Sequence, residues 1–169
     1  MRLEIAALLV LASCTTTMRV SREDLQDDVA RRFPREIDKH VVVVRASEPE
    51  IEFPGDPDVL GLRLHVDVAS ASGRSQLAGT ARVEGRLEYV ANEHAFYLRE
   101  PRVTELALDA PEGTRHLSRA VAREAIAELL RDHPLYRLDA RRSEREAKAI
   151  RHLRSAHIRG QDLVLTVGW

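Results

Sequence analysis

The sequence contains little cysteine, few aromatic residues and almost no net charge. Cys14 is the only cysteine among the 169 residues, which fits a domain that is stable without disulfides. Three Phe, three Tyr and one Trp are too few for the base-stacking platforms of proteins that bind single-stranded nucleic acid. A net charge of −1 provides no overall attraction to nucleic acid or to anionic lipid. We therefore expect no nucleic-acid partner.

The short motifs that mark common active sites are also missing. The sequence has no GxSxG, HExxH, CxxC, P-loop or GxGxxG motif. Its seven histidines are scattered without the spacing of metal ligands. The adjacent carboxylates of Asp27 and Asp28 lie on the polar face of a predicted helix, where we interpret them as solubilising charge. The sequence thus predicts a protein that is not an enzyme and that uses no metal and no cofactor.

The N-terminus resembles the leader of an exported lipoprotein. Residues 5–12 form an apolar run that is too short to span a bilayer but long enough for the core of a signal peptide. The run ends in Leu11-Ala12-Ser13-Cys14, which resembles the bacterial lipobox, whose cysteine is acylated. The structural alternative is a buried N-terminal strand with a free core cysteine. We predict a signal peptide (residues 1–13), a lipidated Cys14 with a short tether (residues 14–20) and a single domain (residues 21–169).

Such an anchor predicts where the protein resides. More than one acyl chain makes attachment to a membrane effectively permanent. Thr15 occupies the position at which an aspartate would suggest retention in the inner membrane. We therefore expect an outer-membrane lipoprotein of the bacterial cell envelope that faces the periplasm and has the membrane as a partner.

Two strand patterns and one helix pattern predict the architecture. Residues 59–68 and residues 77–89 alternate between apolar and polar side chains, as in antiparallel strands with one solvated face. Gly79 and Gly85, on the inward face, would let the sheet coil tightly. In residues 114–133, apolar side chains span an arc of roughly 220° around a helix, whereas a helix on a flat layer needs only about 100°. We predict an α+β fold in which a strongly curved antiparallel β-sheet wraps around one long α-helix.

Shorter elements flank this unit. Ser21 and Ser143 are each followed three residues later by an acidic residue, which predicts the N-caps of a short N-terminal helix and of a C-terminal helix. Residues 155–167 predict a terminal hairpin around a central glycine. Pro49 predicts a bulge, bend or edge position in its strand, and Pro101 predicts a bulge.

Residues 137–159 carry a local excess of basic side chains. This segment has eight basic and three acidic residues, so its net charge is +5. One interpretation is a surface that faces anionic lipid headgroups. The other, which we take as the simpler, is a solvated helix and loop balanced by acidic residues elsewhere.

Several short stretches follow one another in an order known from one family. They are the lipobox, a helix ending in Phe33-Pro34, Gly85-Arg86-Leu87-Glu88-Tyr89, Ala95-Phe96-Tyr97-Leu98 with Pro101, His133-Pro134-Leu135-Tyr136-Arg137-Leu138, and Asp162-Leu163-Val164-Leu165. Together they resemble the YceB-like family of bacterial lipoproteins of unknown function, over residues 14–169. That family is similar to half of a tubular lipid-binding (TULIP-type) module, in which a curved sheet wraps a long helix around an apolar groove. The resemblance brings no catalytic residues.

The wide apolar arc and the resemblance lead to one functional hypothesis and one alternative. The hypothesis is a lipoprotein that binds a lipid or other elongated apolar ligand in a groove between sheet and helix. The predicted groove residues are Val121, Ala122, Ala125, Ile126 and Leu129 on the helix, and Leu62, Leu64, Val83, Leu87, Phe96 and Leu98 on the strands. All of them also fit a plain core. The alternative is a structural or adaptor lipoprotein without a ligand, which docks to an envelope protein through the solvated sheet face or the basic segment.

Overall fold

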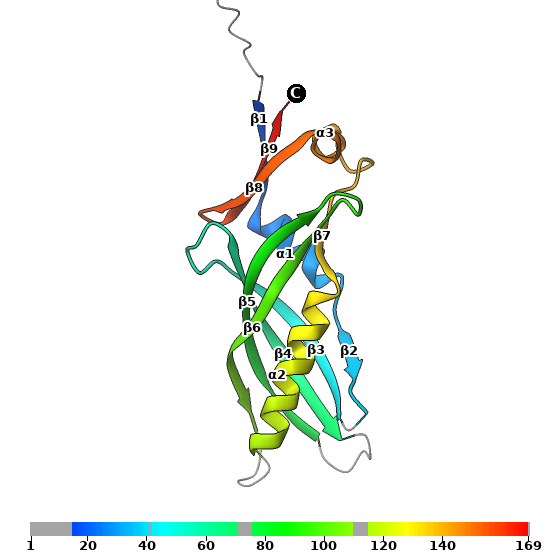
Figure 1. Ribbon diagram of the computed structural model, residues 1–169, viewed down its shortest axis with the longest axis vertical. Helices are drawn as coiled ribbons and strands as arrows, with labels where there is room; N and C mark the ends of the chain where they lie inside the picture. Colours follow the sequence, from blue (N-terminus) through cyan, green and yellow to red (C-terminus); the bar gives the residue numbers. More distant parts are fainter. Residues whose placement is uncertain (1–14, 41, 71–75, 110–114, 169) are drawn as a thin grey trace, which may run out of the picture.

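The computed structural model describes residues 15–40, 42–70, 76–109 and 115–168. Cys14 and the predicted signal peptide lie outside the described residues. Within these ranges the fold is mixed α+β, mostly antiparallel strands with three helices. Figure 1 shows an elongated molecule, with a curled sheet and one helix in its lower part and a smaller sheet above.

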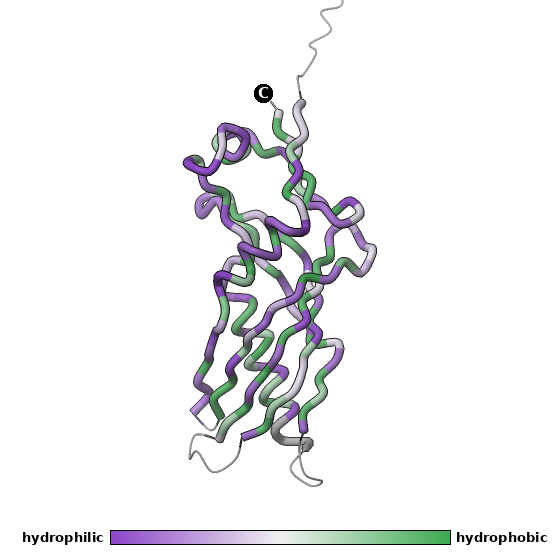
Figure 2. The backbone as a smooth tube through the Cα atoms, turned by 180° about the vertical axis from the view of Figure 1, so that it is seen from behind, coloured by the Kyte–Doolittle hydropathy of each residue, from purple (hydrophilic) through white to green (hydrophobic). Residues whose placement is uncertain are grey.

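The larger sheet is an antiparallel meander. Its six strands pair in the order in which they occur in the chain, and the sheet curls into a half-barrel. Residues alternate between buried and more exposed along β4, as the period-2 pattern predicted, and Figure 2 shows the same alternation in hydropathy. The strands are β2 (Arg35–Asp38), β3 (Val42–Glu52), β4 (Val59–Ser70), β5 (Gln76–Val90), β6 (Ala95–Leu108) and β7 (Pro134–Arg137).

The inward glycines of β5 allow a close approach of β6. A Cβ atom on Gly79 would lie 1.9 Å from the carbonyl oxygen of Ala107, and one on Gly85 would lie 2.8 Å from the carbonyl oxygen of Arg99. The pairing of β5 with β6 shifts between Glu84 and Arg86, which confirms the bulge expected near Pro101. A similar shift in β3 lies beside Pro49, as predicted. The bulges and glycines are the devices that bend a sheet of long strands.

Helix α2 (Arg115–Arg131) packs against β6 and reaches β2 and β3 on its other flank. Arg123 donates to the carbonyl oxygen of Val103 on β6, at 2.6 Å, and Glu128 forms an ion pair with Lys39 beside β2. The helix ends two residues before the predicted end, because the chain turns at Asp132 and His133 into β7. It is one of three helices in the described residues, so the fold is less simple than a sheet around one helix.

Helix α1 (Arg22–Ala30) begins at the predicted cap, where the Ser21 side chain accepts a hydrogen bond from the backbone N–H of Asp24. Its Gln26 side chain holds the bulge of β3. The Gln26 amide donates to the carbonyl oxygen of Pro49 at 2.6 Å and accepts from the N–H of Ile51 at 2.8 Å. Both backbone groups are thereby satisfied where the strand ladder is interrupted.

A second sheet combines the two ends of the described chain. β1 (Thr15–Val20) pairs with β9 (Asp162–Gly168), which also pairs with β8 (Leu153–Arg159) in the predicted hairpin. Residues 15–20 are therefore part of the fold and not the free tether that we expected. Helix α3 (Glu144–His152) lies beside this sheet, and its Ser143 cap accepts from the N–H of Glu146 as predicted.

Candidate functional site

The predicted groove residues lie in the interior between the curled sheet and α2. Ala122, Ala125 and Ile126 are fully buried, as are most of the strand residues. Leu87 is partly buried and packs against this core, and Val121 is partly exposed. The remaining candidates, all at most 2% exposed, are Leu129, Leu62, Leu64, Val83, Phe96 and Leu98.

Several surface cavities are lined by residues other than those of the predicted groove. Four cavities of about 420, 340, 310 and 290 Å³ occur in the described part of the chain. None of the predicted groove residues lines any of these four. Most of the predicted groove residues belong to one buried apolar cluster between the curled sheet and α2.

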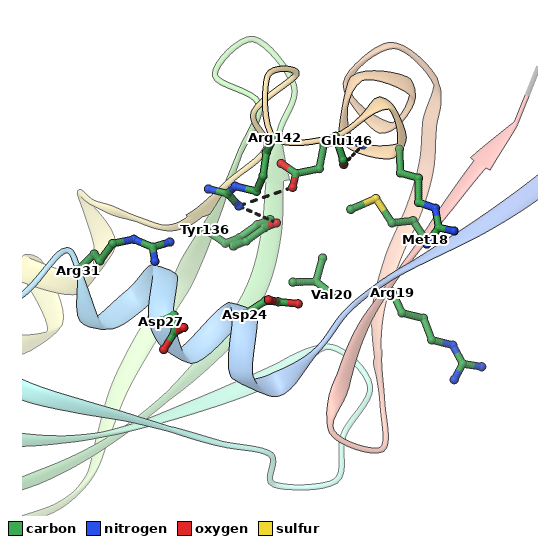
Figure 3. Close-up of a pocket in the computed structure, with 11 residues that line it drawn as sticks. Met18, Arg19, Val20, Asp24, Asp27, Arg31, Tyr136, Arg142 and Glu146 are labelled. Carbon is green, nitrogen blue, oxygen red and sulfur yellow. Dashed lines mark hydrogen bonds and ion pairs between the residues drawn. The ribbon is translucent and has the colours of Figure 1, made fainter.

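The cavity of about 420 Å³ lies at the waist of the molecule, where the two sheets meet, and we call it the waist cleft. Its volume falls in the usual range of ligand sites, roughly 300–1,000 Å³. In Figure 3 the side chains of Met18 and Val20, on one face of β1, point toward Tyr136. The lining residues are Met18, Arg19, Val20, Asp24, Asp27, Arg31, Tyr136, Arg142, Ser143, Arg145 and Glu146.

A buried carboxylate stands behind this cleft. The side chain of Asp28 is only 3% exposed, and three guanidinium groups surround it. Arg32 lies 3.1 Å and Arg142 lies 3.2 Å from its two oxygens, and Arg31 forms a third ion pair. A buried carboxylate needs such partners, because an unpaired charge in the interior is very unfavourable. Asp28 is therefore not the solubilising surface charge that we predicted, whereas Asp27 is exposed.

Arg142 connects this carboxylate to a second buried one. Its guanidinium lies 3.6 Å from Glu146, donates to the hydroxyl of Tyr136 at 3.1 Å and stacks over that ring (Figure 3). Glu146 also accepts from the backbone N–H of Asp139, at 2.7 Å. One side chain thus joins α1, β7 and α3. We call Asp28, Arg142, Glu146 and Tyr136 the waist cluster.

The cluster changes the acidity of its members. Burial opposes ionisation of Asp28, but hydrogen bonds from Arg32 and Arg31 outweigh it, so the pKa of Asp28 lies below its ordinary value of 3.8. Burial raises the pKa of Tyr136 to about 12, with a further contribution from the negative charge of Glu146. Burial would lower the pKa of Arg142, but the surrounding negative groups, Glu146 foremost, raise it. At neutral pH Asp28 is therefore an ionised carboxylate, Arg142 a cation and Tyr136 a neutral phenol.

The part of the sequence that forms this fold and this cluster matches a protein family. The sequence matches the family described as "Protein of unknown function (DUF1439)" over residues 20–160. The chain belongs to the DUF1439 family. The match includes the larger sheet, the waist cluster and the three helices of the described residues, α1, α2 and α3. No curated protein matches the chain.

The waist cleft of this DUF1439 chain has both apolar and polar lining residues, so it can accommodate an amphipathic group. Its Met18 and Val20 are apolar, and its Arg145 and Ser143 are polar. Among the described residues, no three His, Cys, Asp or Glu side chains gather as a metal site would require. No helix in those residues is both long enough and apolar enough to cross a bilayer.

The waist cluster of this DUF1439 chain was not predicted from the sequence. Arg31 and Arg32 follow Asp28 at the i+3 and i+4 spacing of helical ion pairs, which was the one local signal for it. No local pattern in the sequence indicated that Arg142 would form an ion pair with Asp28. Its position next to Asp28 depends on how β7 and α3 fold back onto α1.

Proposed function

We propose that this DUF1439 chain is a YceB-like lipoprotein of the bacterial cell envelope that binds a lipid or other elongated apolar ligand. In this proposal an acylated Cys14 anchors it to the outer membrane, facing the periplasm, and the ligand lies between the curled sheet and α2. The proposal assigns no chemical reaction to the protein.

One observation carries the proposal. The buried side chains between the sheet and α2 are apolar. The two buried charged side chains among the described residues, Asp28 and Glu146, both lie at the waist. An acyl chain against the buried face of α2 would contact mainly apolar side chains. Each buried CH₂ would contribute about 0.8 kcal/mol of hydrophobic stabilisation.

Because the side chains between the sheet and α2 are buried against one another, the ligand has to displace some of them or move α2. The helix is held unequally on its two flanks. Toward β6 it packs closely and donates from Arg123, whereas toward β2 the polar contact is the ion pair of Lys39 with Glu128. These two side chains are 27% and 34% exposed, and ion pairs of this kind contribute about 1 kcal/mol or less. In the proposal the ligand enters at this flank, beside the small side chains of Ala122 and Ala125.

Native mass spectrometry tests the proposal. The mature chain, residues 14–169 with Cys14→Ser to prevent acylation, is exported into the periplasm of a bacterial host and purified without detergent. We expect a co-purifying species with the mass of a lipid, and saturable binding of a fluorescent fatty acid after delipidation. Absence of both would refute the ligand part of the proposal.

A pair of tryptophan substitutions on α2 locates the site. Ala125→Trp fills the interior, whereas Ala120→Trp adds the same side chain on the exposed side of the helix. We expect Ala125→Trp to abolish fatty-acid binding and Ala120→Trp to leave it unchanged. Circular dichroism is needed alongside, because overpacking a core costs about 1–3 kcal/mol. Normal binding by a folded Ala125→Trp variant would place the ligand elsewhere.

A second candidate function is supported by the burial of most predicted groove residues in the core and by the open waist cleft. In this case the protein is an adaptor lipoprotein that has no ligand and docks to an envelope protein at the waist. Crosslinking in cells from a photoreactive residue at exposed Asp27 distinguishes the two functions. A single stoichiometric partner would favour the adaptor, whereas a ligand carrier would give none.

A further inference from the structure

Helix α3 carries a stripe of exposed cations that have no carboxylate partner. Arg145, Lys148 and Arg151 follow one another at intervals of three residues and are all exposed. Among the described residues, no carboxylate lies within 4 Å of any of these three side chains, although Glu144 is on the same helix. In Figure 2, α3 and the segment before it are mainly in the hydrophilic colour.

The solvated face of the larger sheet is different. Arg82 bridges Glu52 and Glu105 at 2.7 and 2.6 Å, and Arg63 reaches Glu52 at 2.7 Å. Arg86 and Arg99 also have carboxylate partners. These four arginines are paired with carboxylates, whereas the three cations of the α3 stripe have no carboxylate within 4 Å among the described residues. Within residues 137–159, Arg137 and Arg142 have carboxylate partners, whereas the three cations of the stripe have none among the described residues.

The stripe lies next to the N-terminal end of the fold. A cavity of about 310 Å³ is lined by Arg145 and Lys148 from α3 and by Thr16, Thr17 and Met18 from β1, with Val167 of β9. We call this cavity the basic cup. Thr16 follows Cys14 by two residues and Met18 by four, so at most about 14 Å of chain separates the cup from residue 14.

We propose that the basic cup and the cationic stripe of α3 bind the phosphate groups of anionic phospholipids in the membrane that holds the anchor. The proposal rests on the acylation of Cys14 in the proposed function. The cup is lined by one ammonium group (Lys148), one guanidinium group (Arg145) and two threonines (Thr16 and Thr17), and these side chains carry suitable donors to phosphate oxygens. Each cation close to an anionic surface contributes about 1 kcal/mol.

This contact would set the orientation of the domain. α3 and the small sheet would face the membrane, and the curled sheet with α2 would extend away from it into the periplasm (Figure 1). A flexible acyl anchor alone allows the domain to tumble, whereas an anchor with a nearby basic surface gives a second attachment.

Vesicle flotation tests the proposal without the anchor. The protein is the chain of residues 14–169 with Cys14→Ser, which includes every described element. Binding to vesicles of phosphatidylglycerol mixed with phosphatidylcholine is compared with binding to phosphatidylcholine alone. The test variant is Arg145→Gln with Lys148→Gln, and the matched control is Arg45→Gln with Arg102→Gln, two exposed arginines of β3 and β6 that are also without an ion pair among the described residues.

We expect binding only to the anionic vesicles, and weaker binding as salt is added. The test variant should bind about 30-fold more weakly, or about fivefold for each cation removed, and the control should bind like the parent. Equal losses in both variants, or no loss in either, would overturn the proposal and point to diffuse charge or to an acidic protein partner. Labelling of the full chain with radioactive palmitate in cells tests acylation separately, so failure of the anchor and failure of the basic cup can be told apart.

Discussion

The guanidinium of Arg142 lies 3.2 Å from the carboxylate of Asp28, although 114 positions separate the two residues in the chain. This contact joins the N-terminal helix to the loop that leads into α3. It lies at the waist, between the smaller sheet and the curled sheet.

Removal of Arg142 should loosen the waist. In Arg142→Ala, Glu146 loses its cation and the Tyr136 hydroxyl loses its donor. We expect a loss of about 1–3 kcal/mol in the free energy of unfolding, measured with urea, because buried polar groups are left without partners. Arg141→Ala, at the exposed neighbouring position, should change stability by no more than about 0.5 kcal/mol. Equal effects of the two substitutions would contradict the role given to Arg142.

Asp28 should make the protein sensitive to acid. Its native pKa lies below 3.8, so its contribution to stability is complete above the unfolded-state value. That contribution is lost as the pH falls from about 4 toward the native pKa, because the unfolded chain takes up the proton first. Asp28→Asn should therefore be less stable at neutral pH and show a shallower loss of stability below about pH 5. Asp27→Asn, at an exposed position, should keep the parental slope in an unfolding titration.

Tyr136 should make the stability of the protein depend on pH in the alkaline range. Its pKa is raised to about 12 from 10.0, so the neutral phenol stabilises the native state below pH 10 and this stabilisation is lost as the pH rises toward 12. Tyr136→Phe removes the hydrogen bond from Arg142 and should cost about 0.5–1.5 kcal/mol at neutral pH. The stability difference between parent and variant should shrink above about pH 10. A difference that stays constant up to pH 12 would show that Tyr136 does not titrate in this way.

Gly79 should tolerate no side chain. A Cβ atom there would lie 1.9 Å from the carbonyl oxygen of Ala107 and 2.9 Å from the Cα of Leu108, so strand β6 itself would have to move. We expect Gly79→Ala to cost about 3 kcal/mol or more in urea unfolding. Gly61→Ala serves as the control, because the nearest atom to its new methyl group is the Cβ of Glu52 at 3.1 Å. That substitution should cost less than about 1 kcal/mol.

Much of the secondary structure could be predicted from local patterns. The alternation along residues 59–68, the cap residues Ser21 and Ser143 and the C-terminal hairpin all have their expected structures. These features are decided by neighbours within a few positions, through side-chain period and hydrogen bonds to the adjacent backbone. The pairing of Thr15–Val20 with β9 could not be predicted, because the partner strand is at the other end of the chain.

The sequence by itself determined which face of each strand and of α2 is apolar, and it placed a lone cysteine after a short apolar run. Tertiary structure alone decided that Asp28 is buried and that Arg142 and Glu146 meet it at the waist. It also decided that most of the predicted groove residues are buried in the core and that Arg145 and Lys148 line one cavity together with residues of β1. The physical reason is that burial and ion pairing depend on which distant segments meet. A hydrophobic pattern specifies that a face must be covered, but not which segment covers it.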